Sequence, residues 1–402
     1  MGRPKVGHEL MGASKPRALN VLLHVVFFAS GIATVLIGQV LPILSARFAL
    51  NDLQAGYFFP AQFAGSIIGT LATNWFGRRN NFVLATILGS ALMAAGVTGM
   101  SLTSYEGCLA GFFVNGLGIG LTLPSINMLI LEMNPLRSAS ALSILNFCWG
   151  LGAIFCKPFV DLTSTRTSIF ITAFLLAIPL LIGAALIGFL PREDHKHLLD
   201  APTQTEDLKP TVIWATGLAW TIAIFNFVHV GFESGMGGWL TTYSDRLNGE
   251  PVVGLFSPTF LFFLFFVIGR GVAPVFFRYM SEDRVLFLDL VLMLAGMLVI
   301  LFAGNVFWLG IGAAVSGFGS SSVFPTNLAR FTRIFGPTAT RRATPLFILG
   351  TLGATSVTWL IGFVSNNAES LRAGMFALLV CVILLVLLQL VLALRSTGSG
   401  KA

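Results

Sequence analysis

Three polar side chains fall on one face of a single hydrophobic segment in the second half of the sequence. Asn226, His229 and Glu233 are spaced by three and four residues, so in a helix they point to the same side. A charged residue in hydrocarbon costs about 2.5 to 3.5 kcal/mol and usually faces a protein interior where it has a function. The pattern predicts ion coupling by Glu233, with His229 as a weaker candidate. The alternative readings are a structural partner for a basic residue and a hydrogen-bonded core histidine.

Glu233 is the one carboxylate that the sequence places well inside a hydrophobic segment. The other acids of these segments are expected near segment ends: Glu132, Asp161 and Asp289. Lys157 lies four residues before Asp161, a spacing that predicts an ion pair within one helix.

A glycine cluster follows Glu233 directly, with Gly235, Gly237 and Gly238 preceding Trp239. The segment that contains it, 212–243, is longer than the roughly 20 residues that cross a membrane. Because glycine gives the backbone extra freedom, a break is expected there. The four residues are predicted to form a gate beside the ion-coupling group.

Amide side chains and one tryptophan recur in the hydrophobic segments. Amides both donate and accept hydrogen bonds, and an aromatic face can stack on a sugar ring, so the set is suited to a neutral sugar. The competing role is to bridge helices, for roughly 0.6 to 2 kcal/mol each. The candidate substrate-binding residues are Gln39, Gln62, Asn115, Asn127, Asn146, Trp149, Asn226 and Asn327.

Arg270, between Gly269 and Gly271, is a cationic residue inside a hydrophobic segment and has two possible roles. It can pair with an acid or extend toward the membrane surface, or it can bind a carboxylate-bearing solute. The second role keeps an organic-anion substrate open.

The elements that must position these residues are membrane-spanning helices. The 402 residues are 55% hydrophobic and only 10% charged, which a soluble domain cannot cover with polar surface. Apolar runs of spanning length recur about twelve times, and only helices satisfy their backbone within such single runs. The predicted spans are 18–43, 52–75, 81–102, 107–131, 138–161, 167–190, 212–243, 252–277, 285–303, 305–328, 343–364 and 370–394.

The arrangement is two pseudo-symmetric bundles of six helices. Gly116-x-Gly118 and Gly317-x-Gly319 are each followed, six residues after the second glycine, by a proline and then closely by an asparagine. Such repeats are how many secondary transporters form one central site. The expected domains are an N-terminal bundle, 1–190, a cytoplasmic linker, 191–211, and a C-terminal bundle, 212–402.

The net charge of +7 is explained by membrane topology and does not indicate nucleic-acid binding, because of where the basic residues fall. With a cytoplasmic N-terminus, most lysines and arginines fall in inner loops, and the predicted outer loops hold Arg47, Arg166, Arg246 and Arg372. The positive-inside rule therefore predicts both termini in the cytoplasm, with the protein in the plasma or inner membrane. The four cysteines have no metal or redox spacing, and no motif for ATP-driven transport, metal binding or hydrolysis occurs, so no enzyme, cofactor or metal centre is expected.

The segment Thr70–Arg79, which closes on Gly77-Arg78-Arg79, resembles the loop signature of the major facilitator superfamily. Asn74 and Trp75 stand where that family usually has an aspartate and a basic residue, so the resemblance implies a weakened charge network between the halves. Family membership implies the twelve-helix fold and transport by alternating access.

Three further segments, Leu41–Gly56, Asn146–Ala153 and Phe324–Asn327, resemble the fucose:proton symporter family. The coupling acids of that family fall on Gly38 and Leu123, so they are missing here. The helix around Glu233, Gly231–Tyr243, is similar to that of the sodium-dependent glucose transporter branch. The resemblance implies a hexose-type sugar and leaves H⁺ or Na⁺ open as the coupling ion.

The sequence thus predicts a secondary active transporter for a small polar solute, a hexose-type sugar first, embedded in the lipid bilayer and sufficient as a monomer. Efflux of an amphipathic drug or lipid-like molecule is one alternative, and organic-anion transport through Arg270 is another. A sensor that binds a solute without moving it is a third.

Overall fold

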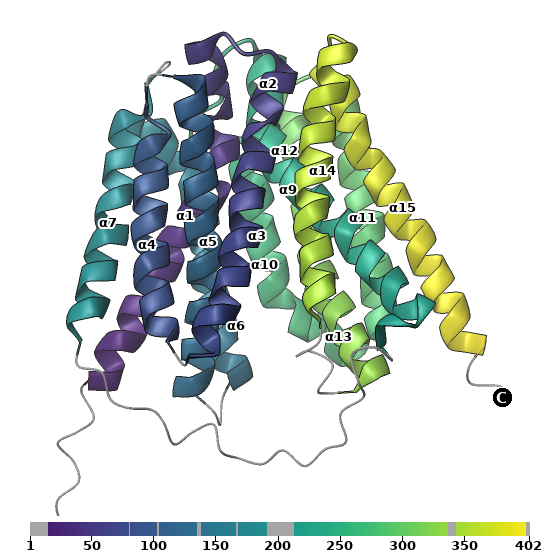
Figure 1. Ribbon diagram of the computed structural model, residues 1–402. Coiled ribbons are helices and arrows are strands. Elements are labelled where there is room, and N and C mark those ends of the chain that lie inside the picture. Colours follow the sequence, from purple (N-terminus) through teal and green to yellow (C-terminus); the bar gives the residue numbers. More distant parts are fainter. Residues whose placement is uncertain are drawn as a thin grey trace, which may run out of the picture.

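The computed structural model describes residues 15–79, 81–102, 104–134, 138–165, 168–190, 213–336 and 343–398 of the chain. All regular structure in these ranges is α-helical (Figure 1). The N-terminal helices are α1 (Lys15–Phe48), the short α2 (Asp52–Gly56), α3 (Phe58–Gly77), α4 (Phe82–Gly99), α5 (Tyr105–Met133), α6 (Ser138–Thr163) and α7 (Phe170–Phe189).

The C-terminal helices repeat this series with one interruption. They are α9 (Gly217–Asn248), α10 (Pro258–Tyr279), α11 (Glu282–Phe302), α12 (Val306–Ser320), α13 (Val323–Phe335), α14 (Thr344–Asn367) and α15 (Leu371–Gly398). Helices α12 and α13 follow each other as the two parts of one crossing.

Polar loop residues start several of these helices. The side chains of Ser104, Thr216, Ser257 and Asn305 each accept a hydrogen bond from the backbone N–H three residues on, at the starts of α5, α9, α10 and α12. Each cap satisfies one of the four N–H groups that a helix start leaves free. These short polar sites set where the long apolar runs begin.

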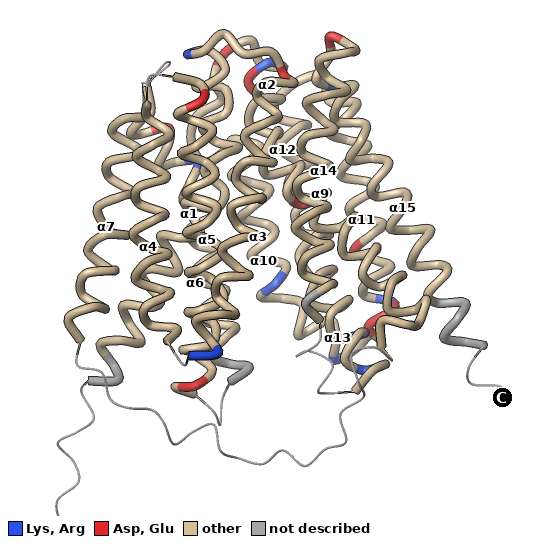
Figure 2. The backbone as a smooth tube through the Cα atoms, in the orientation of Figure 1, with Lys and Arg blue, Asp and Glu red and all other residues tan. Residues whose placement is uncertain are grey.

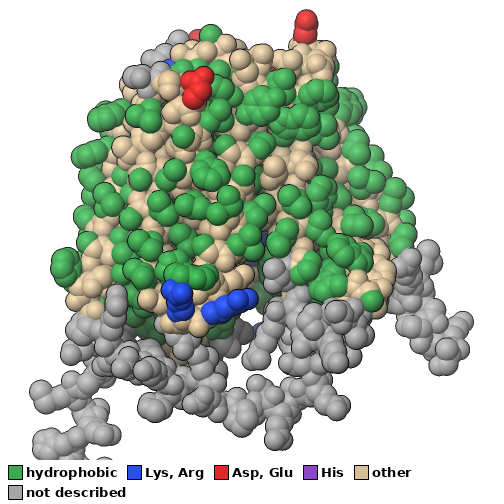
Figure 3. All heavy atoms as spheres, in the orientation of Figure 1, with side chains coloured by type: hydrophobic (Ala, Val, Ile, Leu, Met, Phe, Trp, Pro, Cys, Tyr) green, Lys and Arg blue, Asp and Glu red, His purple; other side chains and the backbone are tan. Residues whose placement is uncertain are grey.

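Ten stretches of the described chain are long and apolar enough to cross a membrane, with α12 and α13 counted together as Val306–Phe335. The other two long helices, α3 and α9, carry more glycine, amide and hydroxyl groups, and they pack among the rest against α5 and α14. The predicted twelve-helix membrane fold is confirmed. Apolar side chains cover the visible lateral surface (Figure 3), and most charged residues lie near the helix ends (Figure 2).

The glycines of the internal repeat make equivalent contacts in the two groups of helices. A side-chain carbon at Gly116 of α5 would overlap the carbonyl of Gln62 in α3, and one at Gly317 of α12 would overlap the carbonyl of Phe262 in α10. Small residues at such positions let helix backbones approach closely. The repeated sequence motif is therefore a repeated packing motif.

Helix pairs outside the motif show the same correspondence. Gly152 of α6 lies against the carbonyl of Phe28 in α1, and Gly353 of α14 lies against the carbonyl of Phe227 in α9. The pairs α1–α6 and α9–α14 are thus built alike. The predicted linker, 191–211, lies outside the described residues, so the division into bundles 1–190 and 212–402 stays a prediction.

The predicted break in the glycine-rich helix is wrong. Helix α9 runs unbroken from Gly217 to Asn248 through Gly235, Gly237 and Gly238. Glycine inside a helix costs about 1 kcal/mol relative to alanine, and here the three glycines lie in close contacts with other helices. The interruption lies instead between α12 and α13, at Ser321 and Ser322.

Candidate functional site

The N-terminal and C-terminal helices meet through a glycine contact between α1 and α9. A Cβ at Gly38 would lie 2.8 Å from the Cα of Gly238 and still closer to the carbonyl oxygen of Gly237. Only glycine at position 38 permits this approach. The residue that the family resemblance places at a coupling-acid position is therefore a backbone contact point here.

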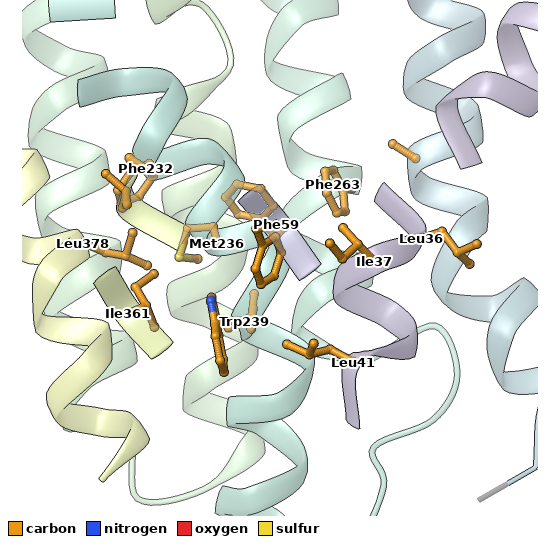
Figure 4. Close-up of a cluster of buried hydrophobic side chains, with 14 of the residues drawn as sticks. Leu36, Ile37, Leu41, Phe59, Phe232, Met236, Trp239, Phe263, Ile361 and Leu378 are labelled. Carbon is orange, nitrogen blue, oxygen red and sulfur yellow. The ribbon is translucent and has the colours of Figure 1, made fainter. Parts of the chain in front are cut away.

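Aromatic side chains close over this contact from both groups of helices. Trp239 is fully buried, donates from Nε1 to the Thr358 carbonyl at 2.9 Å, and packs against Phe59 of α3 with ring centroids 5.9 Å apart. Figure 4 shows these rings beside Phe263, Met236, Ile37 and Leu41. We call this contact, made by Gly38 and Phe59 with Gly237, Gly238 and Trp239, the seal. Three of the four predicted gating residues thus lie in the seal; whether they open and close stays a prediction.

Gly235 and Gly237 face neighbouring helices of their own group. A Cβ at Gly235 would lie 2.6 Å from Leu378 Cδ2, and one at Gly237 would lie 3.1 Å from Phe263 Cζ. These two glycines make room for side chains of α15 and α10, which explains why α9 keeps them without breaking.

Gln39, a predicted substrate contact, belongs to the same seal. Thr241 of α9 donates to Gln39 Oε1 at 2.7 Å, and its hydroxyl also lies 2.8 Å from that of Thr259. The Gln39 Nε2 group is buried without a described partner. The amide therefore joins the two groups of helices and keeps one free donor.

An ion pair that the sequence did not predict lies at the α2 end of the seal. Asp52 accepts two hydrogen bonds from Arg246, one of them at 2.8 Å from Nη1 to Oδ2, and a third from Ser365. Burial raises the pKa of Asp52, but these hydrogen bonds and the Arg246 charge outweigh burial and hold the pKa below its ordinary value of 3.8. We call Asp52, Arg246 and Ser365 the outer latch.

The predicted pair of Lys157 and Asp161 is confirmed and has a second use. Asp161 binds Lys157 within α6 and also accepts a hydrogen bond from the backbone N–H of Gly254 at 3.0 Å. Gly254 belongs to the loop before α10, so this pair also ties the two groups together.

Five hydrogen bonds between the two groups of helices lie on the α2 side of the bundle. The groups also meet by apolar packing. A Cβ at Gly150 of α6, for example, would lie 2.8 Å from Val267 Cγ2 of α10. These five hydrogen bonds therefore fasten the two groups at the α2 end.

Glu233 lies half-buried on α9, just below this seal. Its nearest electrostatic partner is Arg270 of α10, yet no described ion pair joins them within 4.0 Å. His229, one turn earlier, is 1% exposed, with Nε2 3.1 Å from the Ser320 hydroxyl and Nδ1 unpartnered. The two predicted coupling residues therefore lie together, with Arg270 as an addition that the spacing along α9 could not reveal.

Arg270 is half-buried and stacks on a neighbouring ring. Its guanidinium carbon is 4.1 Å from the Phe266 ring centroid, and Nε donates to the Ser321 carbonyl at 3.3 Å. Cation–π contact and one carbonyl leave most of its donors without a described protein partner. Such a group suits an anionic or strongly polar ligand.

Two of the predicted substrate amides, Gln62 and Asn115, form a network inside the N-terminal helices. Asn115 donates to the Ala33 carbonyl at 3.1 Å and to Gln62 Oε1 at 3.2 Å, while Gln62 donates to the Thr34 carbonyl at 3.1 Å. The network bridges α1, α3 and α5. Asn115 Oδ1 remains buried without a partner.

Asn226 and Asn327 bridge the C-terminal helices in the same manner. Asn226 donates to the Leu346 carbonyl at 2.9 Å and Asn327 to the Ile222 carbonyl at 3.1 Å. The oxygen of each amide is buried without a described partner. These residues hold helices together, with one acceptor atom each left over.

The last three predicted substrate contacts, Asn127, Asn146 and Trp149, make no described side-chain hydrogen bond to another helix. Asn127 and Asn146 each donate to a carbonyl four residues earlier in their own helices, and Asn146 is exposed. Trp149 is half-buried against the core, with its Nε1 group unpartnered. The structure therefore does not bring all eight predicted residues into one cluster. Among the described side chains no group of three or more His, Cys, Asp or Glu residues is placed to hold a metal ion.

Asp289 corrects the expectation that Glu233 is alone among the carboxylates. It lies inside α11, is 5% exposed, and accepts a hydrogen bond from Ser322 at the interruption between α12 and α13. The predicted span begins at residue 285, so the sequence places Asp289 near a helix end. In the structure α11 begins at Glu282 and carries Asp289 two turns inward.

An all-helical membrane protein of two similarly packed groups, fastened at one end and with ionisable residues beneath the fastening, has the architecture of a secondary transporter. The sequence profile of the Major Facilitator Superfamily matches residues 23–349. The chain belongs to this family. It is accordingly an integral membrane transporter of small molecules and not an enzyme.

Similarity to individual proteins is distant. The 4-hydroxybenzoate transporter PcaK of Pseudomonas aeruginosa is 27% identical over 145 residues, which cover 35% of this chain and 32% of that protein. The match thus spans about a third of that relative.

Solved transporters share the fold along nearly the whole chain. A D-xylose-proton symporter aligns with a TM-score of 0.78 at 16% identity, over 94% of this chain and 97% of that one. The E. coli fucose:proton symporter FucP aligns with a TM-score of 0.63 at 18% identity, over 94% and 99%. The predicted resemblance to this superfamily, with FucP among similar structures, is confirmed.

Proposed function

We propose that this transporter moves a small polar solute, a hexose-type sugar, by alternating access and couples the movement to an H⁺ or Na⁺ gradient. The observation that carries the proposal is the position of Glu233. It lies on the helix that forms the seal, four residues before Gly237, which contacts α1. A change of charge at Glu233 is therefore made next to the contact that must open.

The seal supports alternating access. Its glycine, aromatic and ionic contacts form a discrete set that can separate as a unit while the helices within each group stay packed. We infer that the termini are cytoplasmic, which makes the fastened α2 end the outer end and this structure an inward-facing state. The predicted plasma or inner membrane location and monomeric state belong to the same proposal.

Free polar atoms support a hydroxyl-rich solute. Buried groups without a partner cost about 1 to 3 kcal/mol each, so they favour a ligand or water that satisfies them. The unpartnered atoms among the predicted contacts belong to Gln39, Asn115, Trp149, Asn226 and Asn327. Two similar structures are named as proton symporters of the sugars D-xylose and fucose, which is consistent with this substrate class.

Replacing Glu233 with Gln tests the coupling. The variant keeps the shape of the side chain and removes its charge, so we expect loss of concentrative uptake with sugar exchange at equal concentrations retained. Uptake against a gradient that survives in Glu233→Gln at the wild-type level would assign coupling to another group.

Organic-anion transport is the second candidate, favoured by the unpaired donors of Arg270 and by the partial similarity to a 4-hydroxybenzoate transporter. It predicts that 4-hydroxybenzoate raises the unfolding temperature of the purified protein while D-glucose does not. The opposite pattern supports the sugar.

A further inference from the structure

The interruption between α12 and α13 collects ionisable side chains from three other helices. The serine run Ser320–Ser322 is contacted by His229 of α9, Arg270 of α10 and Asp289 of α11. Each partner lies on a different helix, and each meets a different serine. A break in a transporter helix exposes backbone groups that can bind ions or polar groups.

The three side chains differ in how much of their hydrogen-bonding capacity these contacts use. His229 Nε2 lies 3.1 Å from Ser320 Oγ, and Arg270 Nε donates to the Ser321 carbonyl at 3.3 Å. Asp289 accepts from the Ser322 hydroxyl, the one hydrogen bond described for its side chain. A carboxylate has room for several more donors, so Asp289 is the least satisfied of the three in ionised form.

Asp289 is closely surrounded. It is 5% exposed, Ser322 is 2% exposed, and a Cβ at Gly319 would lie 2.6 Å from the Asp289 carbonyl oxygen. The backbones of α11 and α12 therefore approach closely at this point.

Among the described residues, no ion pair within 4.0 Å involves Asp289. The hydrogen bond described for its side chain comes from Ser322. Helix α12 carries no charged residue. Of the charged residues on α11 and on the helices that pack against it, Arg270 meets the Ser321 carbonyl and the Phe266 ring, and the others lie near helix ends or in other ion pairs. Those whose side chains the structure describes are Arg270 and Arg278 on α10, Glu282, Asp283 and Arg284 on α11, Arg330 and Arg333 on α13, and Arg372 on α15.

We propose that Asp289 carries a proton in this conformation and that release of the proton repositions α13. An enclosed carboxylate with one donor and no cation is strongly disfavoured relative to the neutral acid. Solvent water supplies the proton and takes it back. This inference rests on the proposed coupling of transport to an ion, and it names the proton and a second residue besides Glu233.

Movement of α13 would reach the residues beneath the seal. Asn327 of α13 donates to the Ile222 carbonyl of α9, two turns before His229, and Arg330 of α13 pairs with Asp283 at 2.9 Å. Loss of the Asp289 proton calls for additional donors or water, which requires α13 to shift relative to α11. The shift would be transmitted to α9 through Asn327.

Infrared spectroscopy of the full-length protein in lipid tests the proposal without a solute. We expect a carbonyl band of a protonated carboxylic acid at neutral pH, its loss as the pH is raised, and its absence in Asp289→Asn. The control is Glu250→Gln, which removes an exposed loop carboxylate and should leave the band unchanged. If Asp289→Asn does not fold, Ser322→Ala serves instead, because loss of the hydroxyl donor should shift the frequency of the band.

Thermal unfolding supplies the second readout. Because a native state that binds the extra proton is favoured at low pH, the wild-type unfolding temperature should fall as pH rises, and that of Asp289→Asn should not follow. A neutral-pH spectrum in which Asp289→Asn matches the wild type overturns the proposal, as does a stability that responds to Na⁺ through Asp289 and not to pH. Absence of sugar transport with the Asp289 band present would refute the hexose assignment and leave the protonation of Asp289 standing.

Discussion

Gly38→Ala is the sharpest test of the seal between the two groups of helices. The added Cβ would lie 2.8 Å from the Gly238 Cα and 2.9 Å from the Gly237 carbonyl carbon, both backbone atoms that cannot rotate away. Overpacking of this kind typically costs about 1 to 3 kcal/mol. Since about 1.4 kcal/mol is a factor of ten, the ratio of sealed to unsealed molecules should fall roughly 5- to 150-fold.

Spin-label distances across the α2 end measure this ratio. Glu106 at the start of α5 and Glu250 before α10 are exposed and belong to opposite groups, so both can carry labels in place of the native side chains. Cys148 is the one cysteine that is not buried, and it is first replaced by serine. We expect the Gly38→Ala protein to show a second, longer distance.

The matched control is Gly188→Ala. A Cβ at Gly188 of α7 would meet Ile87 Cδ1 at 3.7 Å, an ordinary contact, so alanine should be accepted without a change in distance. A folded Gly38→Ala protein with the wild-type distance distribution would refute the argument that this glycine contact holds the two groups together.

Two further predictions concern the outer latch and the amide network. The depressed pKa of Asp52 means that its contribution to stability is complete above the ordinary value of 3.8 and is lost only as pH falls through its lower folded value. A chemical label directed at a residue at the α2 end reacts only when the outer latch opens. The rate of labelling should therefore stay low in the wild type from neutral pH to about pH 4, and it should be high at every pH in Asp52→Asn. A low rate in that variant would contradict the latch. Asn115→Ala removes bonds to the Ala33 carbonyl and Gln62, and should lower the free energy of unfolding by about 1 to 3 kcal/mol in denaturant titrations. A change in sugar affinity with unchanged stability would show that Asn115 is mainly a ligand residue.

The sequence was sufficient for the fold because apolar run length and the Gly-x-Gly repeat report directly on spanning helices and their packing. The repeat even predicts equivalent positions, since Gly116 and Gly317 meet carbonyls of corresponding helices. It failed at the break because glycine content alone does not distinguish a flexible hinge from a close helix contact. The glycines of α9 are contact points, and the interruption falls on Ser321 and Ser322.

The candidate site was predictable only in part. The shared face of His229 and Glu233 follows from helical spacing, but their neighbours come from other helices, and a single sequence does not reveal that Arg270 lies near Glu233. The amides show the same limit. Gln62 and Asn115 look equally suited to a sugar and to a neighbouring helix, and the structure engages both in bridges between helices.

The outer latch was missed for a related reason. In the sequence Asp52 stands at the start of a predicted span and Arg246 in a predicted outer loop, nearly 200 residues apart, and this separation conceals a contact that only the packed helices create. The sequence signal that could have indicated the latch is the opposite charge of Asp52 and Arg246, both expected at the outer end.

Counterflow of radiolabelled D-glucose in proteoliposomes tests the central claim most directly. The account predicts stereospecific counterflow, blocked by competing hexoses and not by L-glucose, with net uptake that responds to a pH or Na⁺ gradient in the wild type and not in Glu233→Gln. Absence of counterflow across the hexose panel would contradict the sugar assignment while leaving family and fold intact.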